Sequence, residues 1–98
     1  MNLYLVLRRS GWRSAEDLTE AAARSTAAGE EMTEDLRWIR SYVLEEGAGS
    51  LGTVCVYEAT GPEAIREHAS QALLPVDEIV LVAETVVVRP DPVAEPAR

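Results

Sequence analysis

The sequence contains no lysine and no phenylalanine, and it has only one cysteine and one histidine among its 98 residues. A single cysteine cannot form a disulfide within the chain, and without a Cys-x-x-Cys pair one copy cannot supply a closed structural zinc site. We therefore expect a protein of the reducing cytoplasm. All nine basic residues are arginines, which together with abundant alanine and valine indicates a bacterial genome of high GC content.

The chain also lacks a concentration of positive charge. Its net charge is −8, and only Arg8 and Arg9 are adjacent among the arginines. Nucleic acids and anionic membrane surfaces repel such a chain, so neither is predicted as a partner. No segment approaches the ~20 apolar residues that a membrane span needs, and the first residues lack the charge order of a secretory signal.

Hydrophobic patterns predict four strands. The predicted strands are 2–8, 34–45, 53–59 and 77–88. The first and third are apolar on both faces, which is typical of central strands covered on both sides. The second mixes polar and apolar residues on both faces, which indicates an edge strand, and the pair Trp38-Ile39 predicts a bulge within it. Arg9-Ser10-Gly11 is expected to end the first strand.

Two helices are predicted between these strands. The first begins after Ser14, whose hydroxyl can cap it, and ends near Gly29. The second begins after Thr60, with Pro62 in its first turn and Glu63 completing a capping box. The expected buried positions of the first helix are Ala15, Leu18, Ala22, Ala23 and Thr26, and those of the second are Ala64, Ile65, His68, Ala69 and Ala72.

The resulting order, β-α-β-β-α-β, is that of ferredoxin-like α+β domains. Right-handed connections give a four-stranded antiparallel sheet with the first and third strands in the middle and both helices on one face. Residues 1–88 form this domain, and residues 89–98, with three prolines, form a disordered or extended tail. The apolar sheet face opposite the helices is expected to pair two copies as a dimeric α+β barrel.

Candidate chemistry is concentrated in Gly52–Ala69, which holds the only cysteine and the only histidine. His68 is a candidate metal ligand, or an acid-base group in a pocket between helix and sheet with Tyr57 as a hydrogen-bond donor. The alternative is a packed histidine bonded to a carbonyl or a tyrosine hydroxyl. Cys55 is a candidate soft metal ligand or nucleophile, or else a small buried hydrophobic residue.

The aromatic residues offer a second kind of site. Tyr4, Trp38, Tyr42 and Tyr57 can line an apolar pocket with polar tips, or they can serve as core and dimer packing. Cys55 is a further ligand-binding candidate. Glu58 is a further ligand-binding candidate. Because it alternates with Tyr57, its side chain is expected on the other sheet face. The alternative for Glu58 is a solvated position or an ion pair with an arginine.

Several motifs together resemble a known family. These are WIRSY (Trp38–Tyr42), CVYEA (Cys55–Ala59), PEAIREHA (Pro62–Ala69) and PVDEI (Pro75–Ile79). The chain resembles a small bacterial family of unknown function that is labelled nickel-binding. The resemblance implies a ferredoxin-like subunit of a dimeric α+β barrel, and nickel or another divalent metal as cofactor. His68 and Glu67 are then the candidate metal ligands.

Three functions follow from these observations. The first is a cytoplasmic homodimeric binding protein with a weak divalent-metal or small-ligand site near Tyr57 and His68. The second is a cofactor-free enzyme of the isomerase, cyclase or oxygenase kind, with His68 as acid-base group and Trp38 and Tyr42 as the apolar wall. The third is a structural or regulatory dimer without a ligand.

Overall fold

A computed structural model describes residues 1–92 and confirms the predicted order of elements. A short 3₁₀ turn lies between the second and third strands. The elements are β1 (Asn2–Trp12), α1 (Ala15–Glu30), β2 (Leu36–Glu45), η1 (Gly47–Gly49), β3 (Leu51–Ala59), α2 (Pro62–Ala72) and β4 (Glu78–Leu81).

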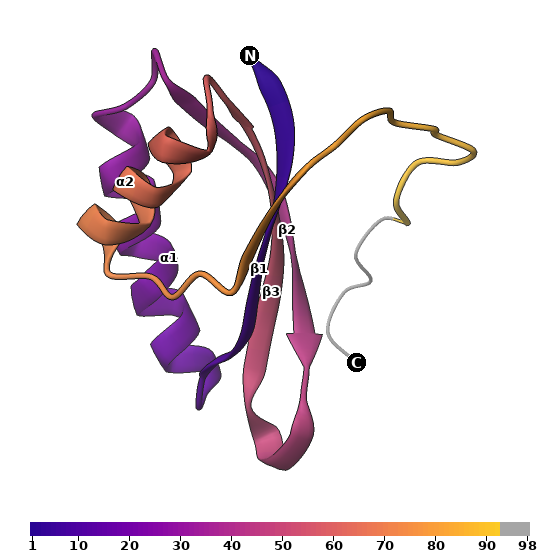
Figure 1. The fold of residues 1–98 in the computed structure, drawn as a ribbon. Coiled ribbons are helices and arrows are strands. Elements are labelled where there is room, and N and C mark those ends of the chain that lie inside the picture. Colours follow the sequence, from indigo (N-terminus) through magenta and orange to yellow (C-terminus); the bar gives the residue numbers. More distant parts are fainter. Residues whose placement is uncertain (93–98) are drawn as a thin grey trace.

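The four strands form one antiparallel sheet in the order β2-β3-β1-β4. The prediction that the first and third strands are central is therefore confirmed. Both helices lie on one side of the sheet, and the chain that follows β4 leads away on the other side (Figure 1). This is the predicted ferredoxin-like α+β architecture. Among residues 1–92, no helix has the length and apolar character required to cross a membrane.

Strand alternation divides β1 and β3 between two sheet faces, here called the helix-covered face and the open face. The residues on the helix-covered face are Tyr4, Val6 and Arg8 of β1, paired with Tyr57, Cys55 and Thr53 of β3. All six are buried. Their neighbours along the strands, such as Leu5 and Val54, belong to the open face and are mostly half-buried. The core is therefore concentrated between the sheet and the helices.

The predicted bulge in β2 is confirmed. Trp38 pairs with Tyr57 and Arg40 pairs with Val56, so Ile39 is the extra residue. This extra residue places Trp38 on the helix-covered face and Tyr42 on the open face. The prediction that Trp38 and Tyr42 form one wall of a pocket is therefore wrong, because regular alternation across the bulge does not hold.

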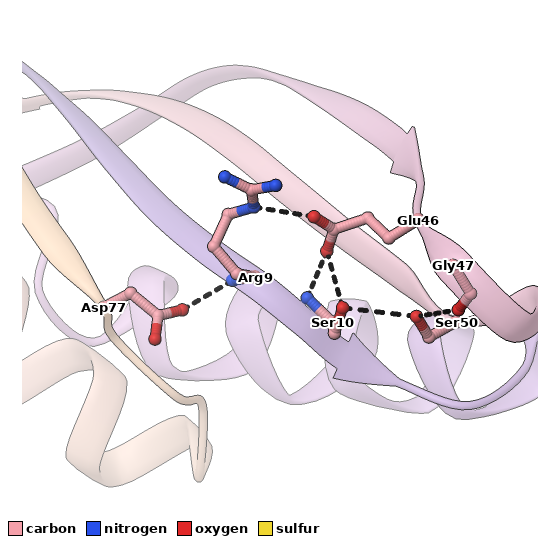
Figure 2. Close-up of polar contacts among 6 residues, drawn as sticks. All are labelled: Arg9, Ser10, Glu46, Gly47, Ser50 and Asp77. Carbon is pink, nitrogen blue, oxygen red and sulfur yellow. Dashed lines mark hydrogen bonds and ion pairs between the residues drawn. The ribbon is translucent and has the colours of Figure 1, made fainter.

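Strand β1 does not end at Arg9-Ser10-Gly11, as predicted, but continues to Trp12 through an irregularity after Arg8. Glu46 stabilises this irregularity from the loop after β2 (Figure 2). Its carboxylate accepts hydrogen bonds from Arg9 Nε (2.6 Å) and from the backbone N–H and hydroxyl of Ser10. The longer strand brings Trp12, paired with Leu51, onto the helix-covered face.

Strand β4 is much shorter than the predicted 77–88. It pairs with Leu7 to Tyr4 of β1, and one more bond joins Val82 N–H to the Leu3 carbonyl oxygen (2.9 Å). Because β1 begins at Asn2, the chain after Val82 has almost no further residues of β1 with which to pair. Val86, Val87 and Val88 follow as exposed chain, with 70 to 80% of their surface accessible.

The predicted tail, 89–98, is described only as far as residue 92, and 93–98 lie outside the described residues. Asp91 accepts hydrogen bonds from Tyr42 Oη (2.7 Å) and Arg40 Nη1 (3.1 Å) on the open face. The predicted domain boundary after residue 88 stays a prediction.

One predicted helix cap is confirmed and the other is wrong. The Ser14 hydroxyl accepts a hydrogen bond from the Asp17 N–H at the start of α1 (3.2 Å). At α2 the cap residue is Gly61, which has no side chain to bond, and Pro62 follows at the first helical position. Thr60 instead lies beside Asp35, whose carbonyl oxygen accepts a hydrogen bond from the Thr60 N–H (2.9 Å).

The buried faces of the two helices differ in how well they follow the predictions. In α2, all five predicted positions are buried. In α1, the fully buried residues are Ala21, Ser25 and Ala28, whereas Ala15 and Ala23 are exposed. Alanine occurs on several sides of α1, so its spacing does not identify the buried side of the helix. Ser25 is polar, and its residue type therefore gave no indication that this position is buried. Thr26 is exposed as well, and Leu18 and Ala22 are half-buried.

Candidate functional site

A cavity of about 310 Å³ lies between α1 and the helix-covered face of the sheet. Residues of β1, α1, β2 and β3 line it, and Leu74 adds to the wall after α2. Most of the wall is apolar or small, and none of the lining residues in the described part of the chain is acidic. The volume is at the lower end of the range of ~300–1,000 Å³ that small-molecule sites occupy.

Arg8 is the unusual residue of this wall. Its side chain is 1% exposed, and Nε, Nη1 and Nη2 have no hydrogen-bond partner among residues 1–92. The guanidinium carbon lies 5.9 Å from the centre of the Tyr57 ring. Such a cation–π contact gives at most about 2 kcal/mol, whereas desolvating an ion costs several kcal/mol. The charge of Arg8 is therefore not compensated within the described residues.

Tyr57 and His68 lie next to Arg8 in the core. The ring centres of Tyr57 and His68 are 5.5 Å apart in an edge arrangement. His68 Nε2 lies 2.9 Å from the carbonyl oxygen of Ser25, and because a carbonyl can only accept, Nε2 carries the proton and donates. Nδ1 is then the unprotonated nitrogen, and it is buried without a partner within residues 1–92.

The same burial shifts both pKa values away from the charged forms. Burial lowers the pKa of His68, opposed by the hydrogen bond to the Ser25 carbonyl. Burial also raises the pKa of Tyr57, and the nearby positive charge of Arg8 opposes this shift. At neutral pH both side chains are therefore neutral, and Arg8 is the charged group of the cavity.

The structure brings some of the predicted ligand-binding residues together and separates others. Trp38, Cys55 and Tyr57 all line the cavity. Tyr42 and Glu58 lie on the open face, where Tyr42 bonds Asp91 and Glu58 lies 3.5 Å from Arg37 in an ion pair. The five residues therefore do not form one site, and Glu58 has the arginine partner that its alternative interpretation required.

His68 itself does not line the cavity. It is 1% exposed and is separated from the space by Ser25 and Tyr57, which it contacts and which do line the wall. Its proposed role as an acid-base group stays a prediction. Cys55 is buried, with Sγ 3.4 Å from Thr53 Oγ1.

The predicted metal ligands do not meet. Glu67 is exposed on α2 and accepts a hydrogen bond from Gln71 Nε2 (3.4 Å), whereas His68 points into the core. Among residues 1–92 there is no group of three or more His, Cys, Asp or Glu side chains that could hold a metal ion. The donor set described for one copy therefore does not fit a nickel site.

Among the residues of this region that were not predicted to be functional are Arg8 and Ser25. The alternation of Tyr4, Val6 and Arg8 contained the signal for Arg8, since it placed all three side chains on one face. Because the strand was expected to end directly after it, at Arg9-Ser10-Gly11, Arg8 was not proposed as a buried residue. Ser25 had no comparable signal, because a serine within a helix is usually solvent-exposed.

The fold and the cavity define a small ferredoxin-like α+β protein with an apolar space between its helices and its sheet. Residues 4–82 match the family described as "Nickel responsive protein SCO4226-like", and the chain belongs to this family. Among solved structures it is similar to SCO4226 from Streptomyces coelicolor A3(2), with a TM-score of 0.67 and 18% sequence identity. The match covers 86% of this chain and 99% of that chain. A search of curated proteins found no match.

Proposed function

We propose that the protein binds a small, largely apolar molecule in the cavity between α1 and the sheet. The observation that carries this proposal is the cavity itself, about 310 Å³ in volume and walled mainly by apolar side chains. Two of its lining residues, Trp38 and Val43, are 40% and 54% exposed, so the cavity opens to solvent. A ligand that covers the apolar wall would remove this surface from water, which is favourable.

The composition of the wall supports the proposal. Trp12 and Trp38, the only two tryptophans of the chain, both line the cavity and provide flat apolar surface. Small residues of α1, such as Ala21 and Ala22, leave the space open. Replacing these alanines with larger residues would fill it.

Intrinsic tryptophan fluorescence tests the proposal, because both fluorophores lie in the cavity wall. We expect benzoate or its uncharged isostere benzamide to change the emission in a saturable way, and calorimetry to give the same dissociation constant. Ala22→Phe should abolish the response by filling the cavity, whereas Ala23→Phe, at the exposed next position of α1, should retain it. Absence of binding for both probes at millimolar concentration, in the unmodified protein, would overturn the proposal.

We also propose that two copies pair through the open face. Val80 of β4 pairs with Leu5 and so lies on the open face, where it is 36% exposed. The exposed valines Val86 to Val88 follow in the chain that leads away on that side of the sheet (Figure 1). Exposed apolar side chains of this kind favour association. Light scattering should give twice the 10.7 kDa mass of the chain. Val87→Asp should reduce this mass while Val76→Asp should not, and a monomeric mass at micromolar concentration would contradict the proposal.

The family name relates these proteins to nickel, and nickel is therefore the metal to test on this chain. Because the described residues of one copy offer no three-ligand group, we expect the protein to retain less than one equivalent after dialysis against nickel. Calorimetry with nickel on the unmodified protein and on His68→Ala provides the measurement. Stoichiometric binding that His68→Ala removes would show that this expectation is wrong and that further ligands complete the site.

A further inference from the structure

We infer that the ligand of the cavity is a small organic monocarboxylate, with an apolar body against the aromatic wall and its carboxylate paired with Arg8. This inference rests on the proposed function and adds the chemical class of the ligand.

The first argument is the state of the Arg8 guanidinium. Its side chain is almost fully buried, it lines the cavity, and its three nitrogens have no partner among residues 1–92. A charge is almost never fully buried unless it is paired, because water must be removed from it without replacement. A partner that is not part of the described chain, placed in the adjoining cavity, would supply the missing interaction.

The second argument is the contrast between Arg8 and those arginines of the chain that do form ion pairs. Arg9, Arg37 and Arg40 each pair with a carboxylate of the chain itself, and all three side chains are at least half exposed. Within residues 1–92, no residue that lines the cavity is acidic, although the full chain carries 17 acidic residues and a net charge of −8. Among the described residues, the wall of the cavity thus contains one positive charge and no negative group to neutralise it.

The third argument selects a carboxylate over a more highly charged anion. A planar guanidinium matches the two oxygens of a carboxylate in a bidentate pair. The single charge of Arg8 balances a single negative charge, whereas a phosphate dianion would need further cations, which the described residues of the wall do not provide. Trp12, Leu18, Trp38 and Val43 offer apolar surface to the rest of the molecule. A carboxylate on a flat or short apolar body satisfies both parts of the wall.

The test compares benzoate with benzamide, which have the same shape but differ in charge. We expect the unmodified protein to bind benzoate at least about tenfold more tightly, since hydrogen bonds to charged groups contribute about 1.5–3 kcal/mol. Arg8→Met should remove this preference while benzamide affinity stays within about threefold, and Arg37→Met, which removes an arginine of the open face, should leave the preference intact.

Each outcome decides a separate statement. Binding of neither probe overturns the proposed function itself. Equal affinity of the unmodified protein for the two probes leaves the cavity as a binding site but overturns the carboxylate inference, and this arm needs no variant to fold. A benzoate preference that persists in Arg8→Met also overturns the assignment of Arg8. Displacement of benzoate by inorganic phosphate at equal concentration overturns the choice of a monocarboxylate.

Discussion

Arg8 and Arg9 are neighbours in β1, yet the structure treats them in opposite ways. The Arg9 side chain is 63% exposed and is bonded to Glu46 at 2.6 Å. Arg8 is 1% exposed, and its guanidinium nitrogens have no hydrogen-bond partner among residues 1–92. In most proteins the buried charge is the paired one, and an exposed charge is left to water.

The difference shows what each arginine contributes. Arg9 and Ser10 hold the irregular end of β1 to the loop after β2 through Glu46 (Figure 2). This pairing serves the fold. Burial of the Arg8 charge destabilises the fold, and the contact with the Tyr57 ring offsets only part of this cost. Such a loss of stability is expected at residues that serve binding.

The largest expected effect comes from replacing Arg8 with a side chain of similar length and no charge. We expect Arg8→Met to raise the free energy of unfolding of the ligand-free protein, by about 1–4 kcal/mol if the gain resembles that seen when buried ions are replaced by apolar residues. Urea unfolding monitored by circular dichroism measures it. A loss of stability would show that Arg8 supports the fold and would remove the contrast with Arg9.

The second prediction concerns acid sensitivity from His68. Because burial lowers its pKa in the folded state, the unfolded chain binds the proton more readily. The contribution of the neutral His68 to the free energy of unfolding is therefore fully present above the unfolded pKa of 6.5, and it is lost as the pH falls below that value. Urea unfolding at pH 7.5 and pH 5.5 should show this loss, and His68→Gln should reduce the difference between the two pH values. An equal difference in both proteins would contradict a buried neutral imidazole.

A smaller effect is expected at Glu46. Its hydrogen bonds from Arg9 and Ser10 lower the pKa of this carboxyl group, so its contribution is present above the ordinary value of 4.5 and is lost as the pH falls below it. Glu46→Gln should lower stability slightly at pH 7, and the difference from the unmodified protein should narrow toward pH 3. In a double-mutant cycle with Arg9→Met, we expect a favourable coupling that salt weakens. No coupling would mean that Arg9 is as unpaired in solution as Arg8.

The smallest effect is expected on the open face. Arg37 lies 3.5 Å from Glu58 with most of its side chain exposed. Arg37→Met should change the free energy of unfolding by about 0.5 kcal/mol or less, because such surface pairs contribute little. The change in the free energy of unfolding for Arg37→Met is the reference value with which the change for Arg8→Met is compared. A large loss would show that the open face depends on its ion pairs more than its exposure indicates.

Much of the fold could be predicted because two periodicities are clear in the sequence. Alternation in 2–8 and 53–59 identified the central strands, and the spacing of Ala64, Ile65 and His68 identified the buried side of α2. Together with the handedness of the connections these patterns determined the sheet order.

The remaining features depend on contacts distant in sequence. The end of β4 is decided by where β1 runs out of residues to pair with, and the continuation of β1 past Arg9 depends on Glu46. The candidate site was predicted only in part for the same reason. Trp38, Cys55 and Tyr57 were recognised by residue type. Arg8 was not, because it is a candidate only through the absence of a partner for its guanidinium among residues 1–92, which no local sequence pattern indicates.

The bulge at Ile39 has a consequence for how the length of this protein can vary. In a regular strand, losing one residue turns every later side chain to the other face. Ile39 is the surplus residue between Trp38 and Arg40, so its removal would restore regular pairing and leave Ser41 and Val43 facing the cavity. Relatives one residue shorter at this point of β2 can therefore retain the same binding wall, whereas a deletion elsewhere in β2 would present Arg40 or Tyr42 to it.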